Sequence, residues 1–224
     1  ITRFNILLLD SNHGKNEGLS QFIESSRMVA FYRAFLDWVV EDEDIGVIIK
    51  PKKEYLLESL PGVNNYIDEV AKNTDRCILI KNSFQKMPNT YLQWIDMVVG
   101  TGTFFSSAVV ECVIHGARGV FYDYPNLRHH EKKLYEWGEN KVIFSDLDNM
   151  LSMVKSYKNN PSKMPEIGDW SSYLNDIDPF HDSKGSIRIG NYLRLVQESL
   201  QKGLTKDDAI IYSNKKYSEI WGSD

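Results

Sequence analysis

Glycine, threonine and serine residues gather between Gly100 and Ser107, in a stretch that separates two apolar segments. These segments, Met97–Val99 and Val120–Tyr122, are typical of buried strands, and we expect a helix between them over about residues 104–115. The turn would follow a strand and open a helix, where unpaired backbone N–H groups and the helix dipole favour an anion, most often a phosphate. Glycine permits such a turn and leaves those N–H groups accessible. The expected phosphate-binding residues are Gly100, Thr101, Gly102, Thr103, Ser106 and Ser107.

Glu111 is the one charged residue in the otherwise apolar segment Ala108–Ile114 of this expected helix. A buried carboxylate is costly unless another group donates hydrogen bonds to it. Ser107 lies one turn earlier, at the spacing that shares a helix face. Glu111 therefore either caps a neighbouring loop or accepts hydrogen bonds from sugar hydroxyls, while Ser106 and Ser107 help to hold phosphates. We favour the second interpretation.

Lysines follow another apolar segment, Ile45–Ile49, in the sequence Lys50–Pro51–Lys52–Lys53. Open α/β sheets bind ligands outside the carboxyl ends of their strands. Lysine suits a phosphate there because its ammonium group is a compact positive charge with three donors. We expect Lys50 and Lys52 to bind phosphate, and a solvated basic turn is the alternative.

Other polar residues are candidates for a second wall of the same crevice or for acid–base chemistry. The loop after the apolar segment Phe4–Leu9 is polar, but it lacks the GxGxxG fingerprint of nicotinamide-cofactor proteins. The segment Asp178–Arg188 either lines the site from the opposite side or forms a helix-capping cluster with a surface arginine. The second-wall candidates are Asn12, Gly14, Asp123, Lys184 and Arg188. No convincing general base is evident, and the candidates for a catalytic role are Asp10, His13 and Asp182.

Composition excludes several broad classes of function. The 224-residue chain has a net charge of −5 with interspersed charges, which argues against general binding to nucleic acid or to a membrane surface. No apolar run approaches the roughly 18 residues of a membrane span, although peripheral membrane association is left open. Cys77 and Cys112 are expected in the core of a cytoplasmic protein, and no metal site is indicated because the histidines are scattered.

Apolar segments of strand length alternate with helical patterns along most of the chain. This alternation predicts an α/β fold, a doubly wound, Rossmann-like parallel sheet of about six strands. We expect residues 1–157 to form this domain and residues 158–224 to form a linker and C-terminal helices packed onto it. In the first of these helices a buried stripe is predicted from the spacing of Ile189, Leu193, Val196 and Leu200.

With these residues in place, the chain resembles the C-terminal, nucleotide-sugar-binding half of a GT-B fold glycosyltransferase. It is most similar to enzymes of surface or capsular polysaccharide biosynthesis. The resemblance is carried by IIKPK (Ile48–Lys52), DMVVGTGTFFSSAVVEC (Asp96–Cys112), VFYD (Val120–Asp123) and DPFHDSKGSIRIGNYL (Asp178–Leu193).

The resemblance implies transfer of a sugar from a nucleotide-diphospho-sugar, the substrate, to a growing surface glycan, without a cofactor. It implies that Gly100–Gly102, Ser106 and Ser107 contact the diphosphate, that Glu111 binds the ribose, and that Lys50 neutralises phosphate charge. The chain departs from the family pattern in two respects. It lacks a second glutamate at the spacing of retaining enzymes, and the glycan acceptor would bind through a missing N-terminal domain. The alternatives are a sugar-nucleotide 2-epimerase-like half, a glycerophosphotransferase half, or a non-catalytic interaction module on the same fold.

Overall fold

The computed structural model describes residues 3–13, 24–81, 86–101, 107–124 and 132–222. The chain divides into two compact units, residues 1–177 and 178–224, which we describe separately. Within the described residues, no helix combines the length and apolar character needed to cross a membrane.

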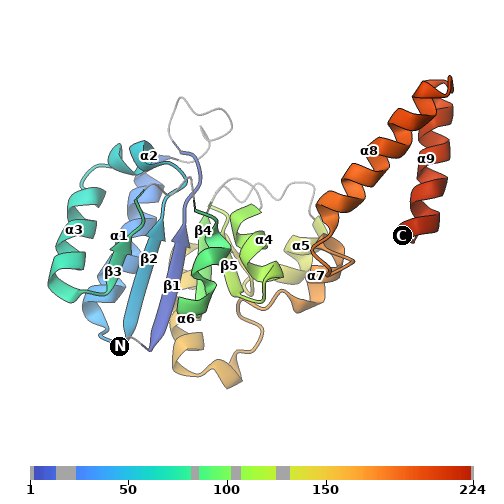
Figure 1. The fold of residues 1–224 in the computed structure, drawn as a ribbon. Helices are drawn as coiled ribbons and strands as arrows, with labels where there is room; N and C mark the ends of the chain where they lie inside the picture. Colours follow the sequence, from blue (N-terminus) through green and yellow to red (C-terminus); the bar gives the residue numbers. More distant parts are fainter. Residues whose placement is uncertain (1–2, 14–23, 82–85, 102–106, 125–131, 223–224) are drawn as a thin grey trace. The chain divides into compact units, whose positions relative to one another are not determined.

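The first unit is built on a six-stranded, all-parallel sheet with the order β3-β2-β1-β4-β5-β6 (Figure 1). This architecture confirms the prediction of a doubly wound parallel sheet. β3 and β6 are short, with three and two residues. The strands are β1 (Phe4–Leu9), β2 (Ile45–Lys50), β3 (Cys77–Leu79), β4 (Met97–Thr101), β5 (Arg118–Tyr122) and β6 (Ile143–Phe144).

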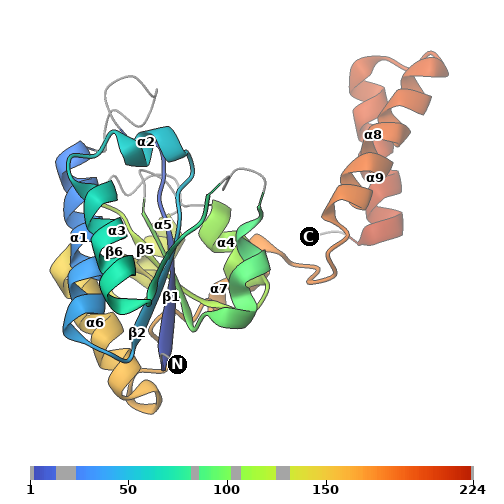
Figure 2. The same cartoon turned by 60° about the vertical axis from the view of Figure 1, so that its left-hand side comes forward.

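Helices cover the two faces of the sheet, as Figure 2 shows. Side chains alternate along β1, so that Ile6 and Leu8 join one buried cluster and Leu7 and Leu9 join the other. The first cluster contains side chains of α1 (Ser25–Glu41), α3 (Val63–Thr74) and α6 (Leu147–Asn159). The second contains side chains of the 3₁₀ helix η3 (Pro88–Trp94) and of α4 (Ser107–Ile114) and α5 (Lys132–Gly138). The described residues of this unit also form the shorter helices α2 (Glu54–Glu58), η4 (Pro161–Lys163) and α7 (Ser171–Ile177).

The first unit extends to Ile177, beyond the boundary expected at residue 157. The indole N–H of Trp170 donates to the Gly119 carbonyl at 2.7 Å. Arg118 donates to the carbonyls of Pro165 and Ile167, each at 2.7 Å. These bonds attach the segment after α6 to β5, so it belongs to the core and is not a free linker.

The second unit is a pair of helices, α8 (Gly185–Gln201) and α9 (Lys206–Trp221). Gly203, with φ +86°, follows the end of α8. Thr205 caps α9, because its hydroxyl accepts from the Asp208 N–H at 3.2 Å. Packing of these helices onto the sheet domain stays a prediction.

The predicted buried stripe of α8 is wrong. Ile189, Leu193 and Leu200 are 64%, 61% and 45% exposed, and Val196 is half-buried. The side chains buried in this unit are instead polar or small: Arg188 and Ser199 from α8, and Ala209 and Ser213 from α9. Small residues at the seam let two helices approach closely, so the larger apolar side chains lie on the outside.

Gly100 allows α4 to pack closely against β4. A Cβ atom at this position would lie 2.3 Å from Cγ2 of Val109, and one at Gly119 would lie 2.7 Å from Cγ1 of Val113. Both contacts are far inside the normal separation of carbon atoms. Gly100, one residue before the end of β4, is therefore needed for helix packing.

We predict that Gly100→Ala lowers the free energy of unfolding by about 1–3 kcal/mol, because α4 must move away from the sheet. Urea unfolding measures this change. Gly190→Ala is the control, since no atom lies within 4 Å of its Cβ position in α8 and alanine favours helix. Equal stability of Gly100→Ala and the wild type would contradict the packing argument.

Candidate functional site

The sheet order reverses between β1 and β4, which makes the crevice outside their carboxyl ends the expected ligand site of the fold. Leu9 pairs with Lys50 on one side and with Gly100 on the other, and Gly100 pairs with Phe121. The ends of β2, β1, β4 and β5 therefore lie side by side. We call this region the carboxyl edge; its described residues are Asp10–His13, Lys50–Lys52, Gly100–Thr101, Asp123 and, from α4, Glu111.

Asp10 is a buried carboxylate that connects three elements at this edge. It follows β1 and is only 6% exposed. One carboxylate oxygen, Oδ2, accepts from the Tyr32 hydroxyl of α1 at 2.9 Å, and the other, Oδ1, accepts from the Lys52 backbone N–H after β2. Burial raises the pKa of Asp10 to about 6, although these hydrogen bonds and the charges of Lys52 and Lys50 oppose the rise.

Lys50 carries a largely buried positive charge at the end of β2. Its side chain is 9% exposed, and burial lowers the pKa of its ammonium group. The negative charges of Asp10 and Glu111 act in the opposite direction and favour the charged form. Lys50 is thus within electrostatic reach of a carboxylate from β1 and one from α4, as the sequence-based grouping of these residues requires.

Several polar atoms at the carboxyl edge are buried without a hydrogen-bond partner among the described residues. They are Oε1 of Glu111, Oγ of Ser11 and Oδ1 of Asn12. Leaving such a group unpaired costs about 1–3 kcal/mol, so a gathering of them marks a place where a ligand or water can bind. For Glu111, the described residues supply no loop-capping bond to this oxygen.

The phosphate-binding turn is only partly described. Thr101 is buried, and its hydroxyl donates to the Tyr122 carbonyl at 3.1 Å, so that proton is used within the sheet. Ser107 is exposed at the start of α4. The other expected residues of this region, Gly102, Thr103 and Ser106, lie outside the described residues, as does Gly14 of the second wall.

Two more of the expected residues are fully enclosed at this edge. Asp123 is 0% exposed, and its Oδ2 accepts from the Tyr135 hydroxyl at 2.8 Å. His13 is 1% exposed. Asn12, between His13 and Asp10 in the chain, is half-buried. These burials place the loop after β1 and the end of β5 within the same edge.

The remaining expected residues, Asp182, Lys184 and Arg188, belong to the second unit and form a hydrogen-bonded cluster there. The Arg188 guanidinium donates to both carboxylate oxygens of Asp182, at 2.9 and 2.8 Å, and lies 3.8 Å from the centre of the Phe180 ring. The Lys184 N–H donates to Asp182 at 3.0 Å, and this bond, followed by Arg188, lowers the pKa of Asp182. The cluster differs from the helix cap with a surface arginine that the sequence left open, because Arg188 is buried and α8 begins without a side-chain cap. A role in a ligand site stays a prediction.

Tyr32 is the site residue that reasoning from sequence missed. It belongs to the aromatic stripe of α1 and is 1% exposed, which is typical of a core residue. The available signal was its hydroxyl, since a buried tyrosine usually directs this group at a hydrogen-bond partner. The partner, Asp10, lies 22 positions earlier, so no local pattern could identify it.

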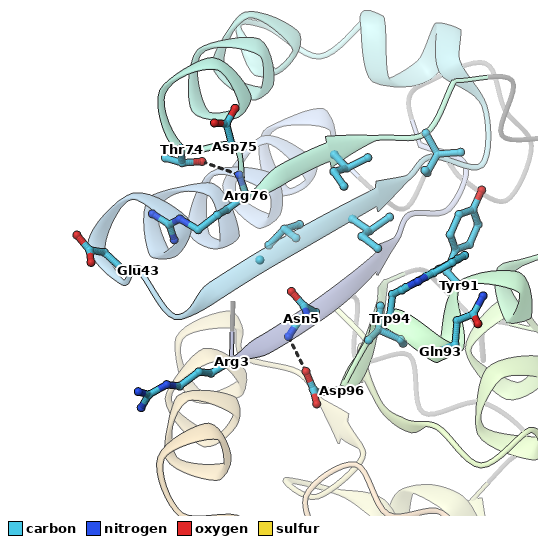
Figure 3. A pocket seen from close by; sticks show the side chains of 16 residues that line it. Arg3, Asn5, Glu43, Thr74, Asp75, Arg76, Tyr91, Gln93, Trp94 and Asp96 are labelled. Carbon is cyan, nitrogen blue, oxygen red and sulfur yellow. Dashed lines mark hydrogen bonds between the residues drawn. The ribbon is translucent and has the colours of Figure 1, made fainter. Parts of the chain in front are cut away.

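A separate groove of about 1040 Å³ lies over β1, β2 and β3 (Figure 3). Trp94 and Tyr91 line one wall, Arg76 and Asp75 lie toward the other end, and the exposed Ile78 contributes to its lining. The groove contains none of the residues expected to bind phosphate. Within the described part of the chain, no group of three or more metal-ligating side chains is placed to hold a metal ion.

Comparison of the sequence with models of known protein families and with curated proteins gave no match. The functional assignment therefore depends on the residues and geometry of the carboxyl edge.

Ionisation of Asp10 is expected to reduce stability. Between pH 4 and 6 the folded protein holds a proton that the unfolded chain has already released, so the free energy of unfolding falls as pH rises. The shift from 3.8 to about 6 corresponds to about 3 kcal/mol. We predict that Asp10→Asn removes this dependence and is more stable than the wild type above pH 6.

Urea unfolding at a series of pH values from 4 to 7.5 tests this prediction. Asp37→Asn is the matched control, because Asp37 also accepts from a tyrosine hydroxyl, that of Tyr66, but is exposed. The control should keep the wild-type dependence on pH. A variant Asp10→Asn that is less stable than the wild type at pH 7.5 would contradict the prediction.

Proposed function

We propose that the first unit binds a nucleotide-diphospho-sugar at the carboxyl edge. It would be the donor-binding half of a glycosyltransferase that moves the sugar to a growing surface glycan. The observation that supports this most directly is the register of the sheet. It brings Lys50, a buried cation, into one row with Gly100, where the predicted phosphate-binding turn begins.

Diphosphate recognition accounts for the basic side of the edge. A partly desolvated ammonium group interacts with an anion more strongly than one in water, because the effective dielectric constant is lower. Lys50 is in such an environment, and the exposed side chain of Lys52 can reach the same anion from solvent. In sugar transfer, negative charge builds up on the leaving diphosphate, so these lysines would stabilise the transition state.

Recognition of the ribose or of the sugar accounts for the unpaired polar atoms. Ribose hydroxyls donate hydrogen bonds, and the buried Oε1 of Glu111 and Oδ1 of Asn12 are acceptors that the described residues leave unpaired. The Ser11 hydroxyl can donate or accept. A ligand with several hydroxyl groups next to a diphosphate satisfies both halves of the edge, which an isolated phosphate does not.

The acceptor glycan and the catalytic base are proposed to come from a further domain. Asp10, which interacts electrostatically with both lysines, is enclosed and hydrogen-bonded at both oxygens, which does not suit a base that must reach a sugar hydroxyl. A cytoplasmic location is supported by the free, buried thiols of Cys77 and Cys112, which suit a reducing compartment.

Calorimetric or NMR titration of the chain with UDP, CDP, GDP and CMP tests this function. We predict binding in the micromolar to millimolar range with one base preferred. Lys50→Met, which keeps the apolar stem and removes the charge, should weaken binding by about 10- to 100-fold, the usual cost of losing a hydrogen bond to a charged group. Glu111→Ala should also weaken it, through loss of the ribose contact.

Lys72→Ala is the control for charge, since Lys72 is exposed on α3 and distant in sequence from the carboxyl edge. It should leave every affinity unchanged. If no nucleotide binds, either to this chain or to a longer one that includes a preceding domain, the donor-binding function is wrong and the interaction module becomes the better hypothesis.

A further inference from the structure

Asp10 fixes the position of the segment that carries the two lysines. Its Oδ1 accepts from the N–H of Lys52, and the intervening Pro51 is buried and has a restricted φ angle. The carboxylate of β1 therefore orients the chain between Lys50 and Lys52. Through the Tyr32 hydroxyl, the same carboxylate is also attached to α1.

The negative charge of Asp10 opposes the binding of an anion beside these lysines. At an edge of low dielectric constant, a diphosphate and a carboxylate would compete for the same positive charges, those of Lys50 and Lys52. A proton on Asp10 would remove this repulsion. By thermodynamic linkage, an anion that binds near a titratable carboxylate then favours its protonated form.

Tyr32 allows Asp10 to take up a proton without losing its hydrogen bonds. The hydroxyl of tyrosine is both a donor and an acceptor. With Asp10 ionised, Tyr32 donates to Oδ2; with a proton on Oδ2, the carboxyl group donates to Tyr32. The Lys52 N–H can donate to Oδ1 in both states. A backbone N–H or a lysine in place of Tyr32 could not reverse in this way.

We propose that Asp10 is a positioning residue that couples anion binding to proton uptake: the diphosphate binds beside Lys50 and Lys52 together with one proton on Asp10. The proton comes from solvent, no covalent bond other than this O–H bond forms, and the Tyr32 hydroxyl changes from donor to acceptor. This inference rests on the anion-binding part of the proposed function and adds a regulation by pH to it.

Among the described residues, the charged and titratable groups that interact with Asp10 are Tyr32 from α1, Lys50 at the end of β2 and Lys52 after it. Burial and the charge of Asp10 raise the pKa of Tyr32 well above its usual range, so Tyr32 does not titrate near neutrality. Other titratable groups of the carboxyl edge are Glu111, which acts on Lys50, and the buried His13 and Asp123. A measurement that is specific to the Asp10 carboxyl carbon separates its titration from theirs.

Inorganic sulfate is the probe for this linkage, because its charge stays constant between pH 5.5 and 7.5 whereas the terminal phosphate of a nucleoside diphosphate titrates there. We predict that the wild-type chain binds sulfate roughly five- to tenfold more tightly at pH 5.5 than at pH 7.5. Carbon-13 NMR should show the Asp10 midpoint moving to higher pH when sulfate is added, with the Lys52 amide signal following the same titration.

Substitutions at Asp10 separate its charge from its hydrogen bonds. Asp10→Asn keeps an acceptor for Lys52 and should bind sulfate with little dependence on pH, at pH 7.5 at least as tightly as the wild type. Asp10→Ala loses the acceptor and should bind more weakly than Asp10→Asn at both pH values. Tyr32→Phe should raise the midpoint of the pH dependence, since the hydroxyl that this variant loses favours the ionised form of Asp10. The control Asp37→Asn should keep the wild-type profile.

Equal sulfate affinity at the two pH values, or a pH dependence that persists in Asp10→Asn, would overturn the inference, as would the absence of sulfate binding. Failure of the donor function is distinguishable from this. It would show in the nucleotide titrations, while sulfate still bound with a pH dependence that requires Asp10.

Discussion

Parallel pairing of β1 with β2 and with β4 is the constraint on which the candidate site depends. Because Leu9 pairs with both Lys50 and Gly100, residues separated by 41 to 91 positions in the chain reach one edge of the sheet. A parallel sheet aligns the carboxyl ends of its strands, and a reversal of strand order leaves a crevice between two of them. A shift of one residue in the pairing with β2 would point the Lys50 side chain away from this crevice, and a shift in the pairing with β4 would displace Gly100 from it.

Much of this arrangement could be predicted from sequence because it follows from local patterns. Short apolar segments separated by helical patterns indicated the strands, and polar or basic residues directly after three of them indicated the edge. Asp10, Lys50 and Asp123 are buried there as a consequence of strand position. The predictions failed where tertiary packing, and not the local sequence, determines which segments belong to the core. Trp170 joins the first unit by a hydrogen bond to β5, which no linker-like composition reveals.

The stripe of α8 shows a second reason for such failures. Apolar spacing predicts that one face of a helix is buried, but it does not identify the partner that covers this face. In α8 and α9 small residues such as Ser199 and Ala209 make the seam, and Leu193 lies outside. Arg188 was ambiguous for a similar reason: its local sequence suits a ligand site and a helix cap equally, and it does not reveal that the guanidinium is buried and paired with Asp182.

The carboxylates of Asp182 and Asp10 have different hydrogen-bond partners, and their pKa values are shifted in opposite directions. Asp182 is paired with a guanidinium, which keeps its charge, and its pKa lies below the usual value. Asp10 is paired with a neutral hydroxyl and a backbone N–H, and its pKa is raised to about 6. An arginine beside Asp10 would have stabilised the ionised carboxylate, but it would also have prevented any change of charge.

A titratable carboxylate beside the buried Lys50 is costly for folding and has no evident structural advantage over asparagine, which could accept the same bond from Lys52. The same carboxylate gives the lysines a counter-charge when no ligand is bound. Burial lowers the pKa of the Lys50 ammonium group, and the charge of Asp10 opposes this by favouring the protonated form. An anion that arrives can replace that counter-charge, provided that Asp10 loses its own. The neutral hydroxyl of Tyr32 is the partner that permits this exchange, since it can bond to Asp10 before and after the charge is lost.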